Sequence, residues 1–222
     1  MVKLIAFFKR RPGLSPQAFQ EHWRTPHAEL VVRQAGLRRY VQNHAAGPEG
    51  QSREPVYDGV AEAWFDDTES MRALASSPEY RAVREDEAHF IDASSMGVLL
   101  TNEVAVIDGP ETGVKMITFL NRRPDVTPDF FQKYWREDHG PLAAEIPGLR
   151  RYVQCHARPG IYSAGRSPLF DGIPFSWFDD MESLRASGTS SAYARTRADE
   201  ANFMVSGRLP FVITKAHEIP VN

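Results

Sequence analysis

The chain has 222 residues, of which 42% are hydrophobic and 25% are charged, and its net charge of −3 argues against a nucleic-acid partner. Its single cysteine, Cys155, excludes an intrachain disulfide framework and fits a reducing compartment. No apolar run approaches the roughly 20 residues of a membrane span, and a strand-like segment begins at Val2, so we expect a cytoplasmic protein with no signal peptide and no membrane partner.

The first predicted element is a strand over Lys3–Phe8, which is rich in aromatic and branched residues. Ser15, followed directly by a proline, supplies the N-cap of a helix that runs through Trp23. Thr25-Pro26 predicts a kink or a restart in this helix, with the threonine as a second cap. Gly36 ends the helix.

A second strand follows, and then a long loop of turn-forming residues over Ala45–Val56, which Ala157–Leu169 repeats later in the chain. Asp66-Asp67-Thr68-Glu69 has the pattern of a capping box and predicts a second helix. We therefore predict strands over Arg39–His44, Asp58–Phe65 and Val98–Val106, and a helix from the capping box to about Phe90 that Ser77-Pro78 interrupts.

The second half of the chain repeats the first. Val2–His44 aligns with Val114–His156 without a gap, and 22 of the 43 positions are identical. Tyr57–Ser70 aligns in the same way with Phe170–Ser183. The chain is therefore expected to be a duplicated unit with two domains.

Each copy has the order β-α-β-β-α-β, which is that of a ferredoxin-like unit. Copy one covers residues 1–108, copy two covers residues 114–222, and residues 109–113 form the linker. A four-stranded sheet with both helices on one side leaves its other face bare, and that face must be covered. We therefore predict an α+β fold in which the two tandem units pack sheet to sheet as an intramolecular dimeric α+β barrel.

Each copy carries an aromatic residue, a tryptophan and a histidine at intervals of four residues, which on a helix fall near one stripe. They are Phe19, Trp23 and His27 in copy one, and Phe131, Trp135 and His139 in copy two. The stripe takes the histidine toward the core, either as a general base or as a buried imidazole that only holds the helix in place. A histidine after a helix restart lies near the positive end of the helix dipole, which favours the neutral form that a base needs.

Polar residues alternate along the second strand of each copy. In copy one Val41 points to one face, while Tyr40, Gln42 and His44 point to the other. Copy two repeats this set as Tyr152, Gln154 and His156. Because such a polar set does not suit a helix-packing face, we expect it to face the cavity between the sheets, or solvent.

These residues resemble the EthD family of the dimeric α+β barrel superfamily. The resemblance includes the Phe-x3-Trp-x3-His pattern above and the segments Gly36–His44 and Gly148–His156, Tyr57–Gly59 and Phe170–Gly172, Trp64–Asp67 and Trp177–Asp180, and Asp86–Phe90 and Asp199–Phe203. Typical members carry one unit and dimerise, whereas this chain fuses two. The resemblance implies the fold, and it implies an activity from a wide range: cofactor-free dehydratases, decarboxylases and cyclases on polyketide-like or aromatic compounds, lactone isomerases, cofactor-free oxygenases, and haem-degrading enzymes.

The copies differ at three positions that bear on the chemistry. Glu62, His89 and Asp92 of copy one are replaced by Phe175, Asn202 and Val205 in copy two. If Glu62 shares a face with Trp64, the first cavity is acidic and the second more apolar. We therefore expect copy one to hold the more active site.

Asp86 and its counterpart Asp199 could orient a histidine or bond a backbone group, and Trp64 and Trp177 are expected in the core or in a cavity wall. The predicted catalytic residues are His27, His139, Tyr40, Tyr152 and Asp86, and the predicted substrate-binding residues are Gln42, His44, Glu62, Trp64, His89, Gln154, His156 and Trp177.

The expected activity is that of a cofactor-independent lyase or isomerase, acting by dehydration, decarboxylation or proton-transfer isomerisation on a small hydrophobic, aromatic or polyketide-like substrate. A cavity histidine would remove a proton next to a carbonyl while tyrosine and glutamine groups bind the developing enolate oxygen. The alternatives are an oxygenase of the same fold, cofactor-free or haem-dependent, and a non-catalytic carrier of small ligands. No metal-ligand spacing stands out, so we expect no metal and no cofactor, and the outer helices leave a homodimer open.

Overall fold

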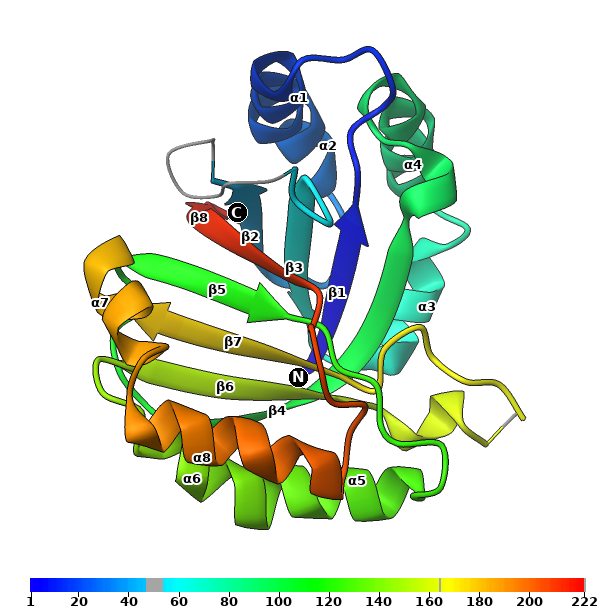
Figure 1. Cartoon of the computed structure of the whole chain (residues 1–222). Helices are drawn as coiled ribbons and strands as arrows, with labels where there is room; N and C mark the ends of the chain where they lie inside the picture. The colour runs from blue at the N-terminus through cyan, green and yellow to red at the C-terminus, as the bar shows by residue number, and fades with distance from the viewer. Residues whose placement is uncertain (47–53, 164, 222) are drawn as a thin grey trace. The chain divides into compact units, whose positions relative to one another are not determined.

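A computed structural model describes residues 1–46, 54–163 and 165–221 (Figure 1). These residues form two units. Unit 1 comprises residues 1–46, 54–101 and 215–221, and unit 2 comprises residues 102–163 and 165–214. Unit 1 therefore contains most of copy one together with the last described residues of copy two.

The sheet of unit 1 is antiparallel, with the order β4-β1-β3-β2. β1 pairs with β3 on one side and with β4 on the other, so that Leu4 lies opposite both Ala63 and Leu100. The sequence predicted all four of these strands to within two residues at each end. The strands are β1 (Val2–Phe8), β2 (Leu37–Ala45), β3 (Gly59–Phe65) and the first part of β4 (Gly97–Ile107).

Helices cover one face of this sheet (Figure 1). Ser15 is the expected N-cap, Asp67 lies in the predicted capping segment, and Ser77 lies at the predicted interruption: the side chain of each accepts a hydrogen bond from the backbone N–H three residues on. The helices bury Phe19 and Phe90 against the sheet. They are α1 (Pro16–His22), the π-helical turn η1 (Trp23–His27), α2 (Ala28–Val31), α3 (Thr68–Leu74), α4 (Pro78–Phe90) and the 3₁₀ turn η2 (Ala93–Ser95).

Unit 2 repeats this plan, with the strand order β8-β5-β7-β6 and helices on one face (Figure 1). Its strands are β5 (Val114–Thr118), β6 (Arg151–Ala157), β7 (Gly172–Phe178) and the first part of β8 (Phe211–Ile219). Its helices are α5 (Pro128–Tyr134), the π-helical turn η3 (Trp135–His139), α6 (Gly140–Ala144), α7 (Met181–Ser187) and α8 (Ser191–Asp199), with short 3₁₀ turns η4 (Pro159–Ile161) and η5 (Glu200–Asn202).

The restart expected at Thr25-Pro26 is wrong. The helix continues through a π-helical turn, Trp23–His27, into α2, and no side chain caps the start of α2. Copy two has the same turn, Trp135–His139, without a proline. Because both copies form this turn, Pro26 is not its cause. Such wide turns occur inside α-helices and are frequent at functional sites.

The glycine of the motif Tyr57–Gly59 makes room for the helix tryptophan. A Cβ atom at Gly59 would lie 2.6 Å from the ring of Trp23, and a Cβ at Gly172 would overlap the ring of Trp135. Each tryptophan can therefore reach the sheet only where the strand carries no side chain.

The two long loops are described only in part. Residues 47–53 of the loop expected over Ala45–Val56 lie outside the described residues, and so does residue 164 of the loop over Ala157–Leu169. The described part of the second loop includes the turn Pro159–Ile161.

The polar residues of the second strand pack toward the helices, so the expectation that they face away from them is wrong. The hydroxyl of Tyr40 accepts a hydrogen bond from Trp23 Nε1 at 3.0 Å, Gln42 Nε2 donates to the Trp23 carbonyl at 2.7 Å, and the ring of His44 stacks on the Trp23 ring at 4.3 Å. A helix residue that offers both an indole N–H and a backbone carbonyl provides partners for these polar groups. The polar side chains of this face therefore have partners inside the protein.

Candidate functional site

Each tryptophan of the repeated motif joins three polar residues of the neighbouring strand in the same way. In copy two Trp135 Nε1 donates to the Tyr152 hydroxyl at 3.0 Å, Gln154 Nε2 donates to the Trp135 carbonyl at 2.7 Å, and the His156 ring lies 4.4 Å from the Trp135 ring. Gln154 also binds His156 Nε2 through its Oε1 at 3.0 Å and is fully buried. Both ends of its amide are thus engaged, which gives Gln154 a positioning role.

The histidine of the motif forms a pair with an aspartate in both copies. Nδ1 of His27 lies 2.8 Å from Asp86 Oδ2, and Nδ1 of His139 lies 2.8 Å from Asp199 Oδ2. Because an ionised carboxylate can only accept, the proton must be on Nδ1, and Nε2 carries the lone pair. The structure thus brings His27 and Asp86 together, as the sequence suggested.

Burial lowers the pKa of His27 and of His139, and the neighbouring aspartate opposes this effect only in part. Both imidazoles are about 5% exposed. The lowered pKa was expected from a helix dipole, but its cause is desolvation, since no helix begins freely at this histidine. The neutral form is the one that can accept a proton at Nε2.

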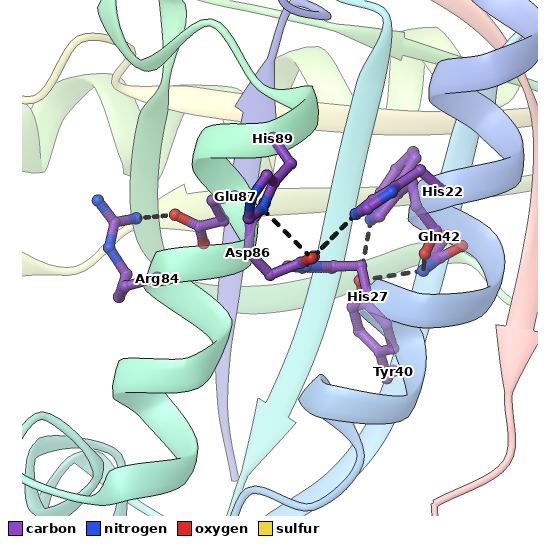
Figure 2. A network of polar contacts seen from close by, with 9 residues as sticks. His22, His27, Tyr40, Gln42, Arg84, Asp86, Glu87 and His89 are labelled. Carbon is purple, nitrogen blue, oxygen red and sulfur yellow. Dashed lines mark hydrogen bonds and ion pairs between the residues drawn. The ribbon is translucent and has the colours of Figure 1, made fainter.

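The surroundings of the two aspartates differ, and Figure 2 shows those of Asp86 in copy one. Asp86 also contacts His22, whose Nε2 is 3.0 Å from Oδ1, and His89 Nδ1 approaches the same oxygen at 3.8 Å. The His89 side chain is 69% exposed, so it lies at the surface of the cluster. In copy two the corresponding partners of Asp199 are neutral donors, Tyr134 at 2.8 Å and Asn202 at 2.9 Å.

Glu62 and Trp64 share the face opposite the helices, as predicted. Lys3 Nζ lies 2.5 Å from Glu62 Oε2 and 4.5 Å from the centre of the Trp64 ring, and Asn43 Nδ2 donates to Glu62 at 2.8 Å. Lys3 neutralises the glutamate, so the expectation of an acidic first cavity is wrong.

The same face of copy two is more apolar, because Phe175 stands in the place of Glu62. Lys115 lies 4.7 Å from the ring centres of both Phe175 and Trp177. The predicted site residues therefore form two groups on opposite faces of each sheet. The tyrosine, glutamine and histidine residues are grouped with the helix, and Glu62, Trp64 and Trp177 lie on the other face.

Unit 2 contains a cavity of about 320 Å³ between its sheet and its helices. His139, Tyr152 and Glu200 line it, and most of the remaining wall is apolar. The apolar wall includes Met116, Leu120, Ala143, Ile146, Leu149, Pro174, Phe178, Leu184, Met204, Leu209 and Phe211. An apolar cavity with a few convergent polar groups is the usual form of a small-molecule site.

Three of the matching positions of copy one hold larger side chains. Ala143 corresponds to Val31, Leu120 to Phe8 and Ser187 to Leu74, and the three residues of copy one belong to its buried core. Larger side chains occupy the volume that is open in copy two. The cavity thus favours copy two as the site, in place of the expected copy one.

Glu200 is the functional candidate that the sequence reasoning missed. Its Oε1 accepts a hydrogen bond from Arg197 Nη1 at 2.7 Å, and burial raises the pKa of its carboxyl to about 7. The motif Asp-Glu-Ala-x-Phe carries this glutamate in both copies, and burial also raises the pKa of Glu87 in copy one to about 7. The sequence did contain a signal for this residue, because both copies carry a charged residue on a helix face that is otherwise buried.

Tyr152 is the third polar group of the cavity. Burial raises the pKa of its hydroxyl to about 12, so the hydroxyl stays protonated near neutrality. It accepts from Trp135 Nε1, which leaves its own proton free to be donated. Two residues of the cavity wall therefore carry a proton acceptor, His139 Nε2, and a hydrogen-bond donor, the Tyr152 hydroxyl.

Among the described residues, no three histidine, cysteine, aspartate or glutamate side chains are placed to hold a metal ion. No helix in the described part of the chain is long and apolar enough to cross a membrane.

The profile of the EthD domain matches this chain twice, over residues 11–94 and 123–207. No curated protein matches the chain. An EthD (ethyl tert-butyl ether D) family protein from Bacillus halodurans C-125 is 30% identical over 47% of this chain and 99% of its own length, with a TM-score of 0.38. The double match confirms the tandem duplication.

The solved structures that resemble nearly the whole chain include the following two. An anthrone oxidase-like protein has a TM-score of 0.63 and 14% identity, and covers 98% of this chain and 92% of its own. A protein from Lactobacillus acidophilus NCFM, described only provisionally as a monooxygenase, has a TM-score of 0.57 and 10% identity, and covers 97% of this chain and 93% of its own. At these identities the likeness shows the fold and nothing more. The fold is α+β, with two tandem ferredoxin-like units, and it belongs to the class of intramolecular dimeric α+β barrels. This is the fold class that the sequence predicted. The chain belongs to the EthD domain family and carries the domain twice.

Proposed function

We propose that the protein is a cofactor-independent enzyme that moves a proton on a small hydrophobic, aromatic or polyketide-like ketone, as a lyase or an isomerase does. The observation that carries this proposal is the pair His139–Asp199 at the wall of an apolar cavity in copy two. A buried neutral imidazole with one nitrogen fixed by a carboxylate is a general base with a defined direction.

The reaction begins when His139 Nε2 takes a proton from a carbon that the ketone makes acidic. Asp199 holds Nδ1 at 2.8 Å and stabilises the imidazolium that forms. The Tyr152 hydroxyl donates a hydrogen bond to the oxygen on which negative charge develops. Gln154 acts through Trp135, whose carbonyl it holds, and not on the substrate oxygen as the sequence suggested.

Copy one serves as the internal control for this mechanism. His27 and Asp86 form the same pair at the same distance, but the core of unit 1 contains the larger side chains of Phe8, Val31 and Leu74 at positions that line the cavity in copy two. The proposal therefore assigns proton transfer to copy two and a structural role to the pair in copy one.

The test is hydrogen–deuterium exchange of anthrone, a small tricyclic ketone with an acidic CH₂ group, followed by proton NMR in deuterated buffer without oxygen. We expect the protein to accelerate the exchange and the His139→Ala variant to lose roughly 10²–10⁴ of the acceleration. The matched His27→Ala variant should keep it, although its melting temperature should fall because the partner Asp86 is left unpaired. Exchange that survives in His139→Ala, or that His27→Ala abolishes to the same degree, would contradict the proposal.

A second candidate is a cofactor-free oxygenase, because the structural relatives include an anthrone oxidase-like protein. It would share the first step, after which the carbanion would react with dioxygen instead of a proton. The same assay in air, with anthraquinone as the product measured, separates the two. Oxygen uptake that depends on His139 would favour the oxygenase.

A further inference from the structure

Glu200 is one of the residues that line the cavity, and one of its carboxyl oxygens lacks a partner among the described residues. Glu200 is 5% exposed, and its Oε1 is held by Arg197. Its Oε2 is sealed from solvent and has no hydrogen-bond partner among the described residues. Burying such an oxygen without a partner costs free energy, commonly about 1–3 kcal/mol. A polar group in this state, in the wall of a cavity, suits a role toward a ligand.

The titratable groups around Glu200 have pKa values that are shifted away from neutrality. Asp199, beside it in the chain, has a lowered pKa because of its hydrogen bonds to His139 and Tyr134, and Tyr152 on β6 has a pKa of about 12 because of burial. Burial lowers the pKa of His139 in η3, and Arg197 on α8 is a permanent cation. With its own pKa near 7, Glu200 is the group in this set that gains or loses a proton around pH 7.

We propose that Glu200 is a second proton-transfer residue of this cavity, and that its acid form binds the uncharged oxygen of a ketone together with the Tyr152 hydroxyl. The proposal names the ligand class of the site that we assigned to proton transfer, and it rests on that assignment for its catalytic half. Two neutral O–H donors around one oxygen are an established way to stabilise an enolate in an apolar pocket.

The step balances as a keto–enol conversion. The C–H bond breaks, its proton goes to His139 Nε2, and its electron pair forms the new C=C bond. The π electrons of the C=O bond take the proton from Glu200 Oε2, which leaves an enol. The carboxylate that remains on Glu200 is stabilised by Arg197, which already contacts Oε1. Proton return from His139 to another carbon, and from the enol oxygen to Glu200, completes an isomerisation.

Copy one offers a matched control. Glu87 stands at the same motif position, pairs with Arg84 on the same helix, and has the same raised pKa of about 7. Its neighbours are core residues such as Val83 and Phe90. Any effect that comes only from a buried glutamate should appear equally at Glu87.

The test is the binding of anthraquinone to the full-length protein, followed by quenching of tryptophan fluorescence between pH 6 and pH 8. Anthraquinone has ketone oxygens but no acidic C–H bond, so it reports binding without turnover. Because binding requires the acid form, the wild-type Kd should rise roughly tenfold over this range. The Glu200→Gln variant, whose amide donates at any pH, should show a flat profile, and Glu87→Gln should keep the wild-type profile.

A second variant guards against a folding effect. Arg197 lowers the pKa of Glu200, so Arg197→Gln should move the inflection to higher pH without removing it. An unchanged profile in Glu200→Gln, a profile lost in Glu87→Gln, or no binding of anthraquinone by the wild type would each overturn the proposal. His139→Ala should bind anthraquinone with the wild-type profile. If anthraquinone binding behaves as expected but the exchange of anthrone does not depend on His139, the proposed reaction is rejected and the ligand assignment is kept.

Discussion

At the scale of single residues, the geometry of the histidine–aspartate pair depends on the hydrogen bonds that the aspartate accepts. Asp199 Oδ2 accepts from His139, while Oδ1 accepts from Tyr134 and Asn202. The carboxylate therefore has one oxygen for the histidine and one for fixed neutral donors. This arrangement holds both the ring orientation and its tautomer.

The Asp199→Asn variant should lose activity while keeping the fold. Tyr134 and Asn202 would keep the amide oxygen on their side, so the amide nitrogen would face His139 Nδ1 and donate to it. The proton would then move to Nε2, and the imidazole could no longer accept one there. We expect anthrone exchange to fall by roughly 10²–10⁴, as for other enzymes in which a wrong tautomer is imposed.

The measurement is the exchange rate together with the melting temperature. Asp86→Asn in copy one makes the same change beside His27 and should leave the exchange rate unaltered. A normal rate in Asp199→Asn would show that His139 does not act through Nε2.

At the scale of elements, the two copies share their backbone plan but differ in the volume between sheet and helices. Ser187 at the end of α7 and Ala143 in α6 are small, whereas their counterparts Leu74 and Val31 are large and buried. The hydroxyl of Ser187 is satisfied by the Leu184 carbonyl at 2.8 Å. The cavity is therefore a product of side-chain size at a few helix positions.

Transplanting the copy-one residues should close the cavity. The double variant Ala143→Val with Ser187→Leu should weaken anthraquinone binding by at least tenfold, because it fills the volume that the ligand needs. Its melting temperature should stay equal or rise, since cavity filling commonly stabilises a protein by about 0.5–2 kcal/mol. Fluorescence titration and thermal melts measure both outcomes.

The control is a change of opposite sense in copy one. Leu74→Ala removes a buried side chain from a packed core and should cost roughly 2–5 kcal/mol of unfolding free energy, with no effect on ligand binding. Unchanged anthraquinone affinity in the double variant would place the ligand elsewhere.

The sequence allowed the elements of both copies to be predicted, because caps such as Ser15 and Asp67 and the period-two strands are local signals. It did not reveal which way the strand residues face. Tyr40, Gln42 and His44 find their partners on Trp23. A polar strand face that packs against polar groups of a helix has the same alternating pattern as a strand face in contact with solvent, so the pattern alone does not distinguish them.

The cavity could not be predicted from the sequence pattern either, because hydrophobic periodicity carries no information on the volume between packed side chains. Glu62 and His89 drew attention to copy one because they are charged or polar. The differences that bear on the cavity are apolar or small, at Leu74 and Ser187. A comparison of the sizes of matched core residues between the two copies would have drawn attention to copy two.

At the scale of the whole molecule, the end of the chain belongs to the unit in which the chain begins. Residues 215–221 are part of unit 1. His217 packs edge-on against His44 at 4.9 Å, and Glu218 accepts hydrogen bonds from Arg39 at 3.1 and 2.8 Å. Ile219 and Val221 pack against the core of unit 1. The sequence repeat alone would assign all of these residues to copy two.

Removal of residues 215–222 should therefore destabilise unit 1, although the deletion lies in copy two of the sequence. The loss of Ile219 and Val221 from the core should lower the melting temperature by several degrees, because burial of each aliphatic side chain is worth on the order of 1 kcal/mol when it is partial. Hydrogen exchange followed by mass spectrometry should show faster exchange in β2 and β3, with little change in β6 and β7. The Glu218→Gln variant isolates the ion pair with Arg39, and it should cost less than about 1 kcal/mol because that pair is exposed. If the deletion instead loosened only β6 and β7, or if Glu218→Gln reproduced its full effect, the assignment of the last residues to the core of unit 1 would be wrong.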